Sequence, residues 1–174
     1  MHDQPRYEPF ESSSLFADGR AARPIPQGTV ARGQLDADPA YYQGKSATGE
    51  PLEVFPVEIT RDLLERGRER YDIYCSPCHD RTGSGTGMIV RRGYPQPTSF
   101  HIDRLREAPP GYFFNAISSG FGVMPGYAVQ VPVADRWAIV AYVRALQASQ
   151  YTSIDDVDPV KRRLLEADTG GVDE

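Results

Sequence analysis

The chain of 174 residues carries a net charge of −5, and this length fits one compact domain with extensions better than two full domains. Its 15 prolines and 16 glycines predict that a good part of the chain is irregular. No stretch approaches the ~20 apolar residues that span a bilayer. We therefore expect no membrane helix in this chain, and we expect no nucleic acid partner.

Residues 1–59 alternate prolines with glycines and show neither helical nor strand periodicity, which predicts an extended arm. Such a composition would by itself permit disorder. However, the arm contains more aromatic residues than a solvated linker requires: Tyr7, Phe10, Phe16, Tyr41, Tyr42 and Phe55. We therefore predict that the arm packs along a surface of this domain or of partner subunits.

The first regular element is a predicted helix that begins after Thr60, the expected N-cap, with Asp62 in its first turn. Apolar residues recur along it at steps of three and four, and Gly67 and Tyr71 fall on that face. A glycine in mid-helix costs about 1 kcal/mol relative to alanine. We therefore expect a second helix to approach closely at Gly67.

This helix leads directly into Cys75-Ser76-Pro77-Cys78-His79. Two cysteines separated by two residues and followed by histidine are the attachment signature of a c-type haem, in which both thiols form thioether bonds and the histidine binds iron. A cytosolic redox pair would need a thioredoxin-like strand and helix around the cysteines, and the flanking pattern supplies neither. A zinc cage lacks an evident second pair of ligands.

The segment after the motif is rich in glycine up to Gly87 and then passes through Tyr94-Pro95-Gln96-Pro97. A proline-bounded stretch in this place is suited to offer a backbone carbonyl to the free ring nitrogen of His79, and this bond would fix the orientation of the ligand. We therefore place Pro97 in the predicted pocket.

A second helix is predicted from Pro110 to about Gly120, and a last helix opens at Pro132. The last helix contains Trp137, Ile139, Val140, Tyr142, Val143 and Leu146. A helix that is apolar almost all round is buried on several sides, and we assign Trp137 to the haem pocket. Residues 150–174 form an acidic tail.

The iron of an electron carrier takes a sixth ligand opposite His79. Met124 is the leading candidate, because it lies in a tight loop between Gly122 and Pro125, and methionine opposite histidine suits a carrier. Met88 is a rival, although only a short stretch of chain separates it from His79. His101 is the other rival and would give a bis-histidine site of lower potential.

The charges divide along the chain. Residues 60–149 contain eleven arginines against eight acidic residues, while the arm and the tail are each acidic. Several arginines follow the motif in sequence: Arg81, Arg91, Arg92, Arg104 and Arg106. Because charged patches steer the association of proteins, we expect these arginines to line a docking face or to hold the haem propionates.

The combination of Gly67, Tyr71, the Cys75–His79 motif, the Met124-Pro125 loop and Trp137 resembles a class I cytochrome c over residues 60–149. The resemblance implies an all-α haem domain in which the first and last helices cross at the glycine. We place Gly67 and Tyr71, with Pro97 and Trp137, in the haem pocket. Three segments of the arm, residues 1–7, 15–20 and 23–33, are similar to the monohaem cytochrome subunit of alternative complex III, a bacterial quinol:cytochrome c oxidoreductase.

The second resemblance implies an electron carrier with one covalent haem c and no catalytic residue of its own. It would relay electrons from a multihaem cytochrome c, beside integral membrane subunits, to a soluble cytochrome c or a terminal oxidase on the periplasmic face of the membrane. Met1 to Pro5 does not resemble a signal peptide, so an export segment or a lipidated cysteine is expected upstream. The alternatives are a free periplasmic shuttle and a haem enzyme with an exchangeable iron site.

Overall fold

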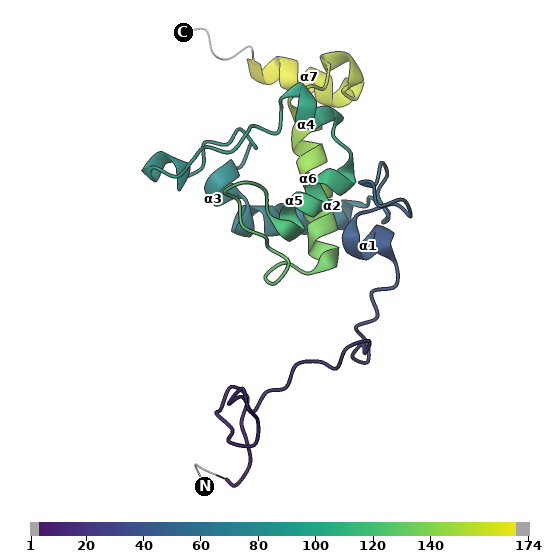
Figure 1. Ribbon diagram of the computed structural model, residues 1–174. Helices are drawn as coiled ribbons and strands as arrows, with labels where there is room; N and C mark the ends of the chain where they lie inside the picture. Colours follow the sequence, from purple (N-terminus) through teal and green to yellow (C-terminus); the bar gives the residue numbers. More distant parts are fainter. Residues whose placement is uncertain (1–3, 170–174) are drawn as a thin grey trace. The chain divides into compact units, whose positions relative to one another are not determined.

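The computed structural model describes residues 4–169, and in this part of the chain the regular structure is helical (Figure 1). β-structure is limited there to isolated bridges, such as the one between Phe121 and Met124. The chain divides into two units between Asp36 and Ala37. None of the helices within residues 4–169 is both long and apolar enough to cross a membrane.

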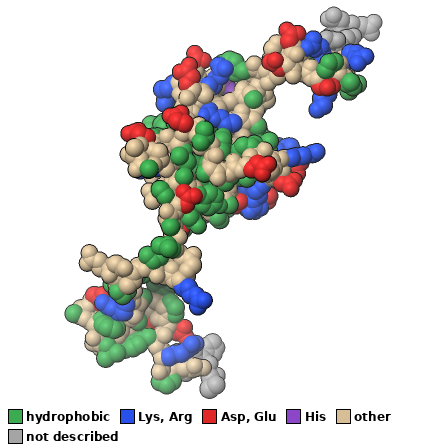
Figure 2. All heavy atoms as spheres, turned by 90° about the vertical axis from the view of Figure 1, so that its right-hand side faces the viewer, with side chains coloured by type: hydrophobic (Ala, Val, Ile, Leu, Met, Phe, Trp, Pro, Cys, Tyr) green, Lys and Arg blue, Asp and Glu red, His purple; other side chains and the backbone are tan. Residues whose placement is uncertain are grey.

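The unit up to Asp36 is irregular and holds its turns through local hydrogen bonds, such as that from the Ser13 amide to the Gly19 carbonyl at 2.9 Å. Its apolar side chains lie on its surface (Figure 2). The exposed fractions of Phe10 and Leu15 are 97% and 74%. The described part of this unit, residues 4–36, therefore has no hydrophobic core of its own.

The second unit is built on two helices that cross, α2 (Arg61–Tyr74) and α6 (Val133–Ser149). Thr60 is the N-cap of α2, as predicted, and its side chain accepts a hydrogen bond from the Leu63 amide at 3.1 Å. The predicted close approach at Gly67 is also confirmed, because a Cβ atom there would lie 2.0 Å from the carbonyl oxygen of Ala138. Glycine therefore allows the two helix backbones to touch.

Shorter elements complete this unit. They are α1 (Pro39–Gln43), α3 (Ser76–His79), the 3₁₀ turn η1 (Val90–Arg92), α4 (Asp103–Glu107) and α5 (Pro110–Ser119). As predicted, α5 begins at a proline and ends at Gly120. The buried core includes Tyr71, Phe114 and Trp137, all with 0% exposure. The predicted burial of the last helix is thus confirmed.

Residues 37–59, which the sequence placed in the arm, belong to this second unit. The indole nitrogen of Trp137 donates to the carbonyl of Tyr41 at 2.7 Å, and the amide of Gly111 donates to the carbonyl of Leu52 at 3.0 Å. This part of the arm therefore packs on α5 and α6 of its own domain.

The acidic tail contains the 3₁₀ turn η2 (Ile154–Asp156) and the helix α7 (Pro159–Thr169). The last five positions of the predicted tail, 170–174, lie outside the described residues. The expected fold class is confirmed: the domain is all-α, preceded by an irregular arm and followed by a short tail.

Candidate functional site

The motif forms a single helical turn at the end of α2. Cys75 is at once the C-cap of α2 and the N-cap of α3. Its carbonyl accepts hydrogen bonds from the amides of Cys78 at 3.2 Å and His79 at 2.9 Å. The spacing of the motif therefore places two thiols and one imidazole on one turn of helix.

Both cysteines are free and partly buried. Burial raises the pKa of the Cys75 thiol to about 12, and the neighbouring Cys78 adds to this effect. Redox-active Cys-x-x-Cys pairs instead have a thiol whose pKa is lowered. The environment of Cys75 is therefore unlike that of a thiol-exchange site.

The imidazole of His79 meets the first condition for a metal ligand, a neutral ring. Burial lowers the pKa of His79 to about 4, so that the ring is uncharged and keeps a lone pair at neutral pH. Its Nδ1 atom is buried and has no hydrogen-bond partner within the described residues.

The hydrogen bond expected from the proline-bounded segment to His79 is not formed. The carbonyl oxygen of Pro97 lies against Gly85 instead, where a Cβ atom would be only 2.3 Å from it. Pro97 is partly buried beside this loop. The carbonyl of Pro97 thus packs against the glycine-rich loop, and His79 Nδ1 is left without this partner.

Asp80 is a central residue of the site that the sequence reasoning missed. Its backbone φ is +54°, which is uncommon for a residue with a side chain. Its carboxylate accepts hydrogen bonds from the amides of Thr82 at 2.6 Å, Gly83 at 2.9 Å and Thr86 at 2.8 Å, and from the Ser84 hydroxyl. Although burial raises the pKa of Asp80, the hydrogen bonds from Ser84 and Thr82 hold it well below its usual value.

Met124 lies in a turn that is tied to the segment following the motif. Phe121 and Met124 exchange two backbone hydrogen bonds, of 3.0 and 2.9 Å. The Tyr94 hydroxyl donates to the carbonyl of Val123 at 2.9 Å. Burial raises the pKa of Tyr127, and the nearby Cys78 and Cys75 raise it further. The loop that carries Met124 is therefore close to the motif, and the role of Met124 as an iron ligand stays a prediction.

The two rival ligands have other surroundings. The side chain of Met88 is 63% exposed and lines, with Pro77 and Ile89, an open cavity of about 630 Å³ beside α3. The Nε2 atom of His101 lies 2.7 Å from the carbonyl of Thr82. His101 is thus engaged with the loop that Asp80 organises.

The remaining predicted pocket residues have mainly structural contacts. Tyr71 is closest to the motif, since its hydroxyl donates to the carbonyl of Asp80 at 2.8 Å. Gly67 lies at the crossing of α2 and α6. Trp137 stacks on Phe114 with ring centroids 4.3 Å apart. The structure therefore gives Gly67 and Trp137 packing partners outside the motif.

Three of the predicted docking arginines have partners inside the domain. The Arg91 Nε donates to the carbonyl of Thr86 at 3.0 Å, and Arg104 contacts the Tyr112 hydroxyl at 3.5 Å. Arg106 pairs with Asp103 at 3.4 Å. These arginines help to hold loops and short helices in place, whereas Arg81 and Arg92 are exposed.

The chain was compared with protein families, curated proteins and solved structures. The family described as "Cytochrome C oxidase, cbb3-type, subunit III" matches residues 62–143. No curated protein matches. One similar solved structure is the Kuenenia stuttgartiensis reducing HAO-like protein complex Kustc0457/Kustc0458, with 23% sequence identity and a TM-score of 0.45. The match covers 56% of this chain and 51% of that chain, so this chain spans about half the length of its structural neighbour.

The all-α fold is that of a class I cytochrome c domain, and the family match over residues 62–143 agrees with it. A domain of this kind carries haem c and transfers electrons. The residues present fit this group, because two unpaired thiols and a neutral imidazole share one helical turn.

Proposed function

We propose that this chain is an electron-transfer subunit that carries one covalently bound haem c and has no substrate chemistry of its own. The observation that carries the proposal is the helical turn of Cys75, Cys78 and His79, with the loop of Met124 held near it. In this proposal Cys75 and Cys78 would hold the haem through thioether bonds, and His79 and Met124 would bind its iron. The bound group supplies one-electron chemistry at iron.

The protein's part is to hold these ligands in place and to keep water away. Burial keeps the His79 imidazole neutral and therefore able to bind a metal. The Tyr94 hydrogen bond ties the Met124 loop to the segment after the motif. An electron carrier gains from such fixed ligands, because a ligand set that does not change between redox states costs little reorganisation.

We further propose that the chain works inside a membrane quinol-oxidising complex of the alternative complex III type. There it would accept electrons from a multihaem cytochrome c and pass them to a soluble cytochrome c or a terminal oxidase. The similarity of the arm to the monohaem subunit of that complex supports this place. So do the exposed apolar side chains of the unit up to Asp36, which need a protein surface to cover them.

The same proposal puts the chain on the periplasmic face of a bacterial cytoplasmic membrane, where covalent haem c is normally attached. Membrane association would come from the complex. A respiratory setting is also supported by the matched family, whose description names an oxidase subunit.

The test is affinity purification of the tagged protein from detergent-solubilised membranes of its native host. The expected result is one haem c per chain in a pyridine haemochrome assay, together with a multihaem cytochrome and integral membrane subunits. Recovery of the haem protein alone as a monomer would favour a free shuttle. A ferrous protein that readily binds carbon monoxide would contradict a six-coordinate carrier and favour a haem enzyme.

A further inference from the structure

The ring of Phe100 lies flat against the imidazole of His79. Their centroids are 4.6 Å apart and their planes differ by 15°, which is a stacked arrangement. An imidazole that binds a metal through one nitrogen can still rotate about that bond unless its surroundings fix it. Among residues 4–169, no group forms a hydrogen bond with His79 Nδ1 that could do so. The stacked ring is therefore the contact that can set the plane of this ligand.

Phe100 is itself enclosed by other groups. Its ring meets Tyr71 edge-on at 6.4 Å and Phe113 at 6.2 Å between centroids. On another side lies Gly83, where a Cβ atom would be 2.8 Å from the Phe100 ring. A ring with neighbours on several sides has little room to turn. Phe100 can therefore transmit a fixed orientation to His79.

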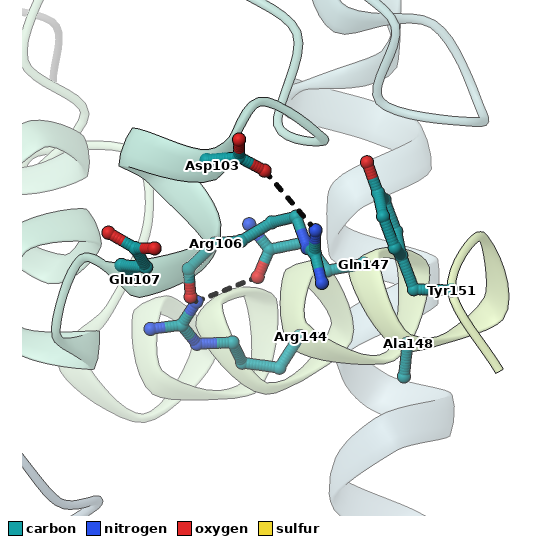
Figure 3. A pocket seen from close by; sticks show the side chains of 7 residues that line it. All are labelled: Asp103, Arg106, Glu107, Arg144, Gln147, Ala148 and Tyr151. Carbon is teal, nitrogen blue, oxygen red and sulfur yellow. Dashed lines mark hydrogen bonds and ion pairs between the residues drawn. The ribbon is translucent and has the colours of Figure 1, made fainter.

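The backbone of Phe100 is held at both of its polar groups. Its amide donates to the Gly83 carbonyl at 2.9 Å, and its carbonyl accepts from the Gln147 amide nitrogen at 2.7 Å. Gln147 is 6% exposed, and its side-chain oxygen accepts from Arg144 at 2.7 Å (Figure 3). The guanidinium of Arg144 also donates to the carbonyl of Arg106 at 3.1 Å. The last helix thus holds the segment of Phe100 from one side.

The loop folded by Asp80 holds the same segment from the other side. The Asp80 carboxylate accepts from the Gly83 amide at 2.9 Å, and Gly83 contacts both the amide and the ring of Phe100. His101, the next residue, contacts the carbonyl of Thr82 in the same loop. Asp80 directly follows His79 in the sequence. The loop that Asp80 folds therefore starts at His79 and holds the segment of Phe100 beside the His79 ring.

We propose that Phe100 is a positioning residue that fixes the plane of the His79 imidazole, and that Asp80 and Gln147 hold Phe100 for this purpose. The inference rests on the proposed role of His79 as an axial ligand. The orientation of an axial imidazole sets the electronic asymmetry of a ferric haem, and the g values of its electron paramagnetic resonance spectrum report that asymmetry. The proposal can therefore be measured apart from electron-transfer activity.

The first test compares Phe100→Leu with Phe55→Leu in the haem-loaded protein. Both rings are partly buried, but Phe55 packs on Trp137, with ring centroids 6.0 Å apart. Both changes should lower the urea midpoint by similar amounts. Only Phe100→Leu should shift and broaden the largest g value of the ferric protein. An unchanged g value in Phe100→Leu, or an equal shift in Phe55→Leu, would overturn the proposal.

Conservative variants keep the test decisive if Phe100→Leu does not fold. Phe100→Tyr retains the stacked ring and should keep the wild-type g values. Asp80→Asn should broaden the g values. The donors of the loop now share the two carboxylate oxygens of Asp80, whereas the amide of asparagine offers only one acceptor oxygen. The matched control is Asp72→Asn, which removes the same charge from α2, outside the loop. Equal spectra for Asp80→Asn and Asp72→Asn would contradict the role of the loop.

Failure of this inference and failure of the proposed function give different results. A wild-type protein without covalent haem overturns both. A wild-type protein with haem c, but with g values that ignore Phe100 and Asp80, overturns the positioning role alone and leaves the electron carrier intact.

Discussion

The backbone of Gly67 on α2 lies directly against the backbone of Ala138 on α6. A Cβ atom at Gly67 would be 2.0 Å from the carbonyl oxygen of Ala138 and 3.0 Å from the Cβ of Tyr142. Beside the crossing, Arg66 donates to both carboxylate oxygens of Asp135, at 2.8 and 3.0 Å. The crossing sets the direction of α2, and α2 ends at Cys75. The packing of the two helices therefore determines where the motif lies.

Gly67→Ala is expected to destabilise the domain. Alanine favours a helix over glycine by about 1 kcal/mol, but the added methyl group meets a backbone carbonyl that cannot rotate away. Overpacking of this kind costs about 1–3 kcal/mol, and occasionally more. We expect a net loss in the free energy of unfolding, measured by urea denaturation. Arg68→Ala, at an exposed position of the same helix, should change it by less than about 0.5 kcal/mol.

Trp137→Phe is expected to loosen residues 37–59. The change removes the indole donor and leaves the carbonyl of Tyr41 without this partner, and an unpaired buried acceptor costs about 1–3 kcal/mol. Hydrogen exchange of amides in residues 37–59 should therefore quicken. Tyr142→Phe is the control, since it also alters one aromatic side chain of α6. Equal exchange in Trp137→Phe and the wild type would show that the indole does not hold this segment.

The helices were predictable from the sequence because their signals are local. Thr60 and Asp62 mark the start of α2, Pro110 and Gly120 bound α5, and these signals depend only on neighbouring residues. The boundary of the arm was not predictable. Whether residues 37–59 pack on their own domain depends on the distant contact between Tyr41 and Trp137, and no local pattern in the arm encodes it.

Met124→Leu tests the sixth ligand. Leucine keeps the apolar bulk but has no sulfur to bind iron, so we expect a lower reduction potential, loss of the methionine-to-iron charge-transfer band and new binding of carbon monoxide by the ferrous protein. Potentiometric titration and absorption spectroscopy measure these changes.

Met88→Leu and His101→Gln are the matched controls for the rival ligands. Both variants should retain the charge-transfer band, because Met88 is largely exposed and His101 contacts the Thr82 carbonyl. His101→Gln should lower the urea midpoint, since it disturbs that contact. A normal spectrum in Met124→Leu, with the band lost in either control, would transfer the ligand assignment to the rival.

The site itself was predictable only in part. Cys75, Cys78 and His79 stand out because the spacing is a chemical requirement. Asp80 and Phe100 do not, although both are central to the structure around His79. An aspartate before a run of threonine, serine and glycine indicates a local turn, and that signal could have identified Asp80. The stacking of Phe100 depends on the path of the loop, which a linear pattern does not contain.

Arg92→Glu tests whether the exposed arginines after the motif steer a redox partner. Arg92 is the better choice than Arg91, because Arg91 also holds the carbonyl of Thr86 and its reversal would disturb the loop. We expect the second-order rate of electron transfer to an acidic soluble cytochrome c to fall about threefold to tenfold at low salt. The haem potential should stay as in the wild type.

Arg68→Glu, an exposed charge reversal on α2, is the control for net charge. Stopped-flow rates measured over a range of ionic strength should converge for Arg92→Glu and the wild type at high salt, because screening removes the steering term. The two reversals change the net charge equally, so only a local docking face slows one variant more than the other. If electron transfer slowed equally in Arg92→Glu and Arg68→Glu, the change in net charge would be the cause. That result would contradict a docking face at Arg92.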